Sequence, residues 1–224
     1  LRAALKRGLA RQALGQAGRE GADLPAIFAA LCDVAPNRKA LERAVLRLGA
    51  AVGVVKVALS AKGGGLALTL RNLREVVLRV EGQEVFRETA LIYTRAVTRP
   101  GCGLHLSRAS FCAHAIERLI ERSNLPLDAP VLTVLDTEAT ALLRGLWQNR
   151  DFSDQDGAFN AARQAGVWAG GQDEMPLEED WGLSYSRDDM RVPLFSVRTF
   201  LSPDEMRPTV WAKWAGDPAL TGRG

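Results

Sequence analysis

The stretch VGVVKVALSAKGGGLALTL, residues 52–70, contains two short apolar runs separated by the glycine-rich segment AKGGG. Upstream of it apolar residues recur at helical spacing, and within it the period changes to the two-residue alternation of a strand. A phosphate-binding loop requires Gly-Lys-Ser or Gly-Lys-Thr at the start of a helix, whereas these glycines precede a second strand-like run. The stretch therefore predicts a β-hairpin after a helical segment, the pattern of a mixed α and β protein.

Strand-like segments continue after this hairpin. The runs at 74–80 and 84–97 flank Gly82 and Gln83, which is a second hairpin signal. Residues 52–97 therefore predict four short antiparallel strands.

Helices are predicted on both sides of this block. Residues 1–50 favour helices, the last of which begins after Asn37 as its N-cap. Pro and Gly residues interrupt the strand pattern at 98–110. We then expect a helix that begins after Ser110 as N-cap and a long helix at 131–148 capped by Asp128.

The last part of the chain mixes both periods. Residues 151–166 predict a short helix, followed by short strands at 167–172, 180–186 and 192–202 and a disordered tail at about 216–224. The expected fold is α+β, with N-terminal helices, an antiparallel sheet of short strands, two central helices and a further set of short strands. We expect a helical segment at residues 1–50 and an α+β domain at 51–224.

Composition indicates an ordinary globular protein, because 47% of the 224 residues are hydrophobic and 25% are charged. No apolar run approaches the roughly 20 residues that span a bilayer, so no membrane partner is expected. Three cysteines do not suggest a disulfide scaffold at this length, and a cytoplasmic location is the default.

Charge is distributed unevenly along the chain. Residues 1–125 carry twenty Lys and Arg against ten Asp and Glu, whereas residues 126–224 carry nine against sixteen. The basic first half predicts an anionic partner such as a nucleic acid, or contact between the two halves or between copies of the chain.

The helix predicted within SFCAHAIERLIERSN, residues 110–124, is amphipathic. At about 100° per residue its apolar half contains Phe111, Cys112, Ala115, Ile116, Leu119 and Ile120. Its polar half contains His114, Glu117, Arg118, Glu121 and Arg122. This polar half is either an ordinary solvated face with ion pairs at i, i+4 or a row with catalytic chemistry.

Cleavage of RNA through its own 2′-hydroxyl would use these residue types. A histidine can transfer the protons near neutral pH, and arginines can bind the phosphate in the transition state. Two nearby guanidiniums would favour the neutral imidazole. His114 is therefore a candidate acid or base, and Arg118 and Arg122 are candidate phosphate ligands.

Zinc is an alternative use of the same segment. Cys102, His105, Cys112 and His114 lie close together in the sequence and are zinc-ligand types. Cys112 and His114 would point about 160° apart on one helix, so the second pair is defective. We expect no metal and no cofactor.

HAIERLIER, residues 114–122, resembles the HA-x-x-R-x-x-x-R helix of small bacterial domains related to the RelE-like ribonuclease toxins. In those domains a later strand packs beside the helix, and FSVRTFLS at 195–202 resembles it. The resemblance implies that Arg198 and Thr199 are partners of His114, with Arg198 binding phosphate and Thr199 positioning the substrate. It covers only these two short pieces of the chain, and the helix motif also occurs in bacterial proteins of phage and plasmid origin without a known activity.

Two functions follow as expectations. One is a metal-independent ribonuclease-like domain that uses His114, Arg118, Arg122, Arg198 and Thr199. The other is a non-catalytic module that binds nucleic acid or protein through its basic half. The sequence leaves open whether the chain is an enzyme.

Overall fold

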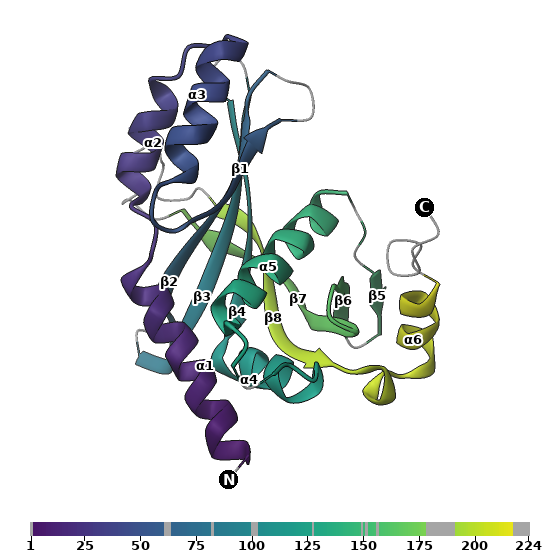
Figure 1. Ribbon diagram of the computed structural model, residues 1–224. Helices are drawn as coiled ribbons and strands as arrows, with labels where there is room; N and C mark the ends of the chain where they lie inside the picture. The colour runs from purple at the N-terminus through teal and green to yellow at the C-terminus, as the bar shows by residue number, and fades with distance from the viewer. Residues whose placement is uncertain are drawn as a thin grey trace.

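The computed structural model describes residues 2–60, 64–81, 83–99, 103–126, 128–148, 150, 152–155, 157–177 and 191–216. Within them the chain forms an eight-stranded sheet and six α-helices (Figure 1). The strands are β1 (Val54–Leu59), β2 (Leu66–Val80), β3 (Gln83–Arg99), β4 (Gly103–Cys112), β5 (Phe152–Asp154), β6 (Gly157–Ala162), β7 (Gly166–Pro176) and β8 (Arg191–Leu201). The helices are α1 (Arg2–Arg19), α2 (Leu24–Cys32), α3 (Arg38–Gly49), α4 (Ala113–Arg122), α5 (Val131–Trp147) and α6 (Pro208–Ala215), with the 3-10 turn η2 (Pro203–Glu205).

The sheet consists of two antiparallel meanders joined in the middle. Its strand order is β1-β2-β3-β4-β8-β7-β6-β5. The first meander, β1 to β4, runs from one edge of the sheet to its centre, and the second, β5 to β8, runs from the other edge to the centre. The joint is the pairing of β4 with β8, which is parallel, whereas every other pair is antiparallel. Its register runs from Arg108 opposite Leu194 to Phe111 opposite Val197.

Helices cover both faces of the first meander. Successive side chains of a strand point to opposite faces, so its strands contribute apolar side chains to a cluster on each side. Tyr93 and Phe111 face the cluster that includes α1, α4 and α5. Ala96 and Leu106 face the cluster that includes α2 and α3. A third, smaller cluster joins α6 to β6 and β7 through Val210. Of the three N-terminal helices, α1 therefore packs in the first cluster, and α2 and α3 pack in the second.

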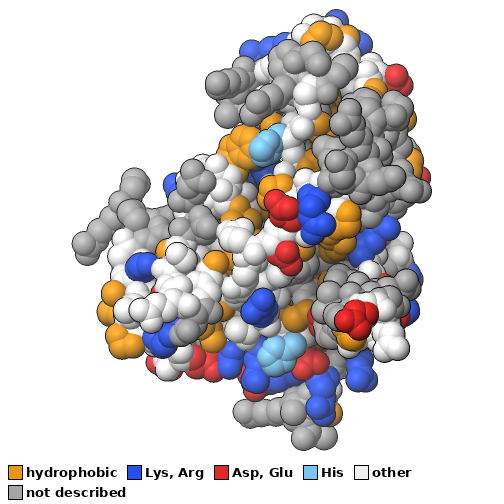
Figure 2. Space-filling model, turned by 180° about the vertical axis from the view of Figure 1, so that it is seen from behind, with side chains coloured by type: hydrophobic (Ala, Val, Ile, Leu, Met, Phe, Trp, Pro, Cys, Tyr) orange, Lys and Arg blue, Asp and Glu red, His pale blue; other side chains and the backbone are white. Residues whose placement is uncertain are grey.

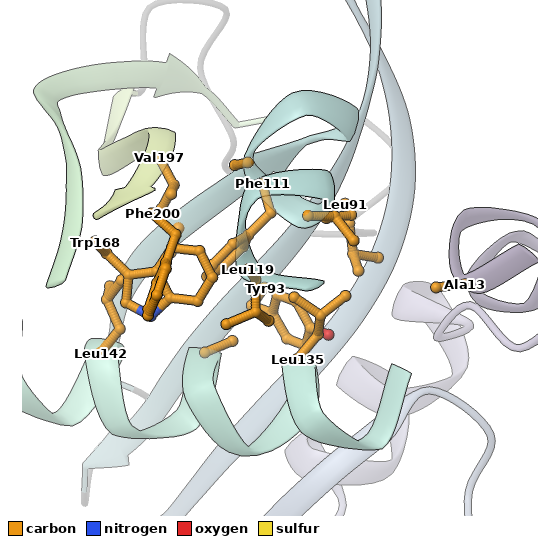
Figure 3. Close-up of a cluster of buried hydrophobic side chains, with 14 of the residues drawn as sticks. Ala13, Leu91, Tyr93, Phe111, Leu119, Leu135, Leu142, Trp168, Val197 and Phe200 are labelled. Atoms are coloured by element: carbon orange, nitrogen blue, oxygen red, sulfur yellow. The ribbon is translucent and has the colours of Figure 1, made fainter. Parts of the chain in front are cut away.

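The main core is built around aromatic rings (Figure 3). Trp168 of β7 is fully buried and meets Phe111 and Phe200 edge to face, each at a centroid distance of 5.1 Å. Leu142 of α5 lies near Trp168, and Leu135 of the same helix lies near Tyr93. Edge-to-face contacts of this kind stabilise a core by roughly 1 kcal/mol each beyond the burial of apolar area.

Several local expectations are confirmed. The fold is of the α+β class, with helices across the segment 1–50 and a hairpin between β1 and β2. Asn37 caps α3 by accepting a hydrogen bond from Ala40 N at 2.9 Å. The long helix α5 lies where its apolar stripe predicts it, and β7 and β8 form at two of the expected strands.

Other expectations are wrong. The predicted four short strands of 52–97 are three, because residues 66–80 form one long strand that continues through Asn72. Residues 98–110, read as an interruption, contribute most of β4. The helix predicted at 151–166 is instead the hairpin of β5 and β6. The further set of strands expected late in the chain is present, and it continues the same sheet.

Two helix caps also differ from expectation. Ser110 lies inside β4, and α4 begins after Cys112. Pro130, and not Asp128, occupies the N-cap position of α5. The strand predicted at 180–186 and most of the predicted disordered tail lie outside the described residues. None of the described helices has the length and apolar character needed to cross a bilayer.

Candidate functional site

The helix with the candidate histidine is capped by a thiol. Cys112 Sγ accepts a hydrogen bond from Ala115 N at 3.4 Å, the role predicted for Ser110. Burial raises the pKa of the Cys112 thiol, which therefore acts as a neutral cap. Four members of the predicted apolar half are buried in the main core, namely Ala115, Ile116, Leu119 and Ile120, whereas Phe111 and Cys112 belong to β4.

His114 is exposed in the first turn of α4. Arg118 donates a hydrogen bond from Nε to His114 Nε2 at 3.4 Å and another from Nη1 to Glu121 Oε2 at 2.5 Å. Glu121 also pairs with Lys6 of α1 at 3.5 Å. The Arg118 hydrogen bond and the charge of Lys6 hold the pKa of Glu121 below its ordinary value. At the lower end of the molecule, where α4 lies, Figure 2 shows basic and acidic side chains mixed around a histidine.

Arg122 is occupied by the end of β8. Its Nη1 donates to Thr199 Oγ1 at 3.3 Å and to the carbonyl oxygen of Phe200. Its Nη2 pairs with Glu205 Oε1 at 2.5 Å. The other oxygen of Glu205 accepts from Ser202 N and Oγ in the capping box of η2. The guanidinium therefore attaches α4 to the end of β8 and has a carboxylate as its counterion.

Arg198 lies apart from this group. It is the unpaired residue of a bulge in β8, and its carbonyl oxygen accepts a hydrogen bond from Sγ of Cys112, the N-cap of α4, at 3.9 Å. Its guanidinium is exposed over β7, 3.6 Å from the position of a Cβ on Gly171. The neighbouring Val197 points to the other face, into the main core. The structure thus brings His114 to Arg118 and Arg122 to Thr199, but it does not bring the Arg198 side chain to them.

Strand geometry argues against the zinc alternative. His105 and Cys112 lie in the same strand, β4, seven positions and hence roughly 23 Å apart. Cys102 lies outside the described residues. Among those that are described, no three His, Cys, Asp or Glu side chains gather in a way that could hold a metal ion.

A cavity of about 640 Å³ lies between α5, β1 and β6, on the side of α5 that faces away from the main core. The outer side of α5 contributes hydroxyl groups to it from Thr133, Thr137 and Thr140. These positions recur at spacings of three and four, so they follow one face of the helix.

The cavity lining is rich in cations. It contains Lys56 of β1, Arg144 of α5, and Arg150 and Arg163 from the segments that flank β5 and β6. In the described part of the chain, none of these four side chains forms an ion pair or a side-chain hydrogen bond. Like charges repel one another, so a bound anion would stabilise this arrangement.

Two polar groups of the lining have no partner in the described structure. Asn160 of β6 is only 2% exposed, and its Nδ2 is buried without a hydrogen-bond acceptor. Its Oδ1 lies 3.7 Å from the position of a Cβ on Gly145, where α5 crosses β6. Thr140 Oγ1 is also buried and unpaired. Because buried polar groups are normally satisfied, this amide donor has room for an acceptor atom of a water or of a bound ligand.

The single carboxylate of the described lining is held by other side chains. Asp136 accepts from Tyr93 Oη at 2.8 Å through Oδ1 and from Arg71 Nη1 at 2.5 Å through Oδ2. Arg71 is buried and also pairs with Glu20 of α1 at 3.1 Å. Burial, and then the charge of Asp136, raise the pKa of Tyr93 well above its ordinary value, so the phenol stays protonated as a donor. Asp136 is therefore occupied by these two donors and forms no ion pair with the four cations of the lining.

Glu138 fixes the turn that carries Arg163. This carboxylate is 1% exposed and accepts from Arg163 N at 3.1 Å, Gln164 N at 2.8 Å and Trp168 Nε1 at 3.1 Å. It connects α5 to the β6–β7 turn, which forms one wall of the cavity.

Sequence reasoning missed this cavity because its lining is dispersed over residues 55–163 without a motif. One signal was present: the outer face of α5 carries threonines and Arg144 at helical spacing, where a solvated helix usually carries paired charges. Three of the four cations belong to the acidic second part of the chain, whereas the charge asymmetry predicted an anion-binding surface in the basic first part.

Comparison of this chain with family models, with curated proteins and with solved structures gave no match. Its function must therefore be inferred from the chemistry of its own residues.

Proposed function

We propose that this chain binds a small phosphate-bearing anion in the cavity between α5, β1 and β6. The observation that carries the proposal is the buried Asn160 amide, which has a free donor in a lining with four cations and no free carboxylate among the described residues. Guanidinium groups match the geometry of phosphate oxygens, and threonine hydroxyls and an amide complete such a site. A volume of about 640 Å³ lies in the range of small-molecule sites.

The proposed activity is binding and not catalysis. The described lining offers donors and positive charge, and its carboxylate, Asp136, is held by Arg71 and Tyr93. It contains no histidine or cysteine within the described residues. These groups are suited to holding an anion and not to transferring its protons.

The ribonuclease hypothesis for the His114 face stays a prediction with weaker support. The pair of His114 and Arg118 is exposed and within reach of a phosphate. Arg122 already binds Glu205, and the Arg198 guanidinium lies on another face. Arg118 pairs with Glu121 in the same way, so two of the three proposed phosphate ligands already have a carboxylate partner.

Calorimetric titration with ribose 5-phosphate tests the anion site. The double variant Arg144→Gln/Arg163→Gln should weaken binding at least about tenfold, since each charge-assisted hydrogen bond contributes roughly 1.5 kcal/mol or more. The matched control is Lys39→Gln/Arg43→Gln on the exposed side of α3, which removes the same charge away from the cavity. Equal losses in the two double variants, or no binding by the unmodified chain, would refute the proposal.

Asn160→Asp gives an independent test. It preserves the size of the side chain but places a carboxylate among the four cations. We expect it to abolish binding of ribose 5-phosphate while the protein stays folded by circular dichroism, because the cations can pair with the new charge. Unchanged binding by this folded variant would show that the ligand does not enter at Asn160.

A further inference from the structure

An exposed aromatic ring stands beside the basic cavity. Trp147 is 39% exposed in the last turn of α5. Arg144, three positions before it, and Gln148, the next residue, both line the cavity. Three positions correspond to about 4.5 Å along a helix, so the ring lies close to the Arg144 end of the cavity.

The ring is held in place from the sheet side. The Arg95 guanidinium of β3 lies 4.8 Å from the centre of the Trp147 ring, and the His105 ring of β4 meets it edge on at 4.6 Å. A cation over one face and an imidazole at the edge fix the orientation of the indole, which nonetheless keeps part of its surface open to solvent. A ring fixed in this way loses little entropy when another flat group stacks on it.

Positive charge continues from the cavity to this ring. Arg95 Nη1 is buried without a hydrogen-bond partner. Burial, and then repulsion from Arg144, lower the pKa of Arg95. Arg95 and Arg144 are thus two neighbouring guanidiniums without a carboxylate counterion in the described structure. An anionic group bound near Arg144 would relieve this repulsion and would place its substituent near Trp147.

We propose that the ligand of the cavity is a nucleoside phosphate, whose phosphate binds among Arg144, Arg163 and Lys56 and whose base stacks on Trp147. This inference rests on the proposed anion site and adds the chemical class of the ligand. Stacking on tryptophan suits any nucleobase, because every base has a π face. The same chemistry fits a free nucleotide and a terminal nucleotide of a strand.

The test compares ligands that share a phosphate and differ in the base. Calorimetric titration of the unmodified chain should show that adenosine 5′-monophosphate binds roughly 5- to 150-fold tighter than ribose 5-phosphate, the range that stacking of a base supplies. In Trp147→Ala this affinity ratio should fall to about one, and Trp147→Phe should retain most of it. The control is Trp211→Ala in α6, where another exposed tryptophan lies away from the cavity and the ratio should be unchanged.

The outcomes separate this inference from the proposed function. Equal affinity of the unmodified chain for the two ligands, or an unchanged ratio in Trp147→Ala, overturns the base-stacking proposal and leaves the anion site standing. Absence of binding by both ligands refutes the anion site itself. A 5′-phosphorylated oligoadenylate distinguishes the two sources, since tighter binding than the mononucleotide identifies a strand and weaker binding identifies the free nucleotide.

Discussion

Removal of the Glu138 carboxylate should destabilise the fold through the three donors it serves. In Glu138→Ala the indole Nε1 of Trp168 loses its acceptor inside the core, where the Trp168 side chain is fully buried and out of reach of solvent. A stranded donor of this kind costs about 2 kcal/mol. The amides of Arg163 and Gln164 lie in a turn at the surface and each lose about 1 kcal/mol. The free energy of unfolding should therefore fall by about 4 kcal/mol.

Urea denaturation followed by circular dichroism measures this loss. The control is Glu42→Ala, which removes a carboxylate from the exposed side of α3 and should change stability little. A double-mutant cycle of Glu138→Ala with Trp168→Phe should give a coupling energy of about 2 kcal/mol, because the second variant removes the indole donor. A loss below about 1 kcal/mol for Glu138→Ala, or a coupling near zero, would refute this account of the β6–β7 turn.

The pH dependence of the same residue has a definite sign. Burial raises the pKa of Glu138 above its ordinary value, and the hydrogen bonds from Gln164, Trp168 and Arg163 oppose this only in part. The folded chain then keeps the Glu138 proton at a pH where the unfolded chain has lost it, so stability from this group falls as pH rises through the folded pKa. The stability advantage of the unmodified chain over Glu138→Gln, measured by urea denaturation, should be larger at pH 4 than at pH 8. An advantage that grows with pH would mean that the hydrogen bonds outweigh desolvation.

Three further perturbations test other contacts of the fold and of the candidate sites. Arg71→Met removes the buried guanidinium between Asp136 and Glu20 and should lower the free energy of unfolding by about 3 kcal/mol in urea, whereas a loss under about 1 kcal/mol would contradict the network. Arg122→Ala and Glu205→Ala should show a coupling energy of about 1 kcal/mol in a double-mutant cycle, and additive losses would mean that the pair does not form in solution. If the ribonuclease hypothesis holds, labelled RNA should be cleaved by the unmodified chain with or without EDTA and left intact by His114→Ala. No cleavage by the unmodified chain would exclude it.

Local signals predicted the parts of the fold that local chemistry determines. The apolar stripe of α5 and the amide of Asn37 act within a few positions of themselves, so their roles were readable from the sequence. Residues 157–162, GAFNAA, belong to the segment 151–166 for which the sequence predicts a short helix. In the structure they form a strand because Asn160 and Phe159 pair with Trp168 and Ala169 of β7, partners that no local pattern reveals.

The candidate sites show the same limit. The apolar face of α4 was predictable because it depends on helical spacing alone. That Glu205 binds Arg122 depends on the path of β8, which follows much later in the chain, and was not predictable. The cavity was harder still to predict from the sequence. Lys56 of β1 and Asn160 of β6 line the same cavity only because α5 lies between the strands that carry them.

The parallel joint between β4 and β8 also bears on how the chain folds during synthesis. Partners in this joint, such as Arg108 and Leu194, are far apart in sequence, so closing it costs roughly 4 kcal/mol of chain entropy before any contact compensates it. Until β8 leaves the ribosome, β4 has an unpaired edge of backbone donors and acceptors next to the buried face of α4. Such an edge is a template for association with other chains. The risk of aggregation through this edge therefore ends when β8, the last strand to be synthesised, pairs with β4. If synthesis stops before residue 191, the edge of β4 stays open.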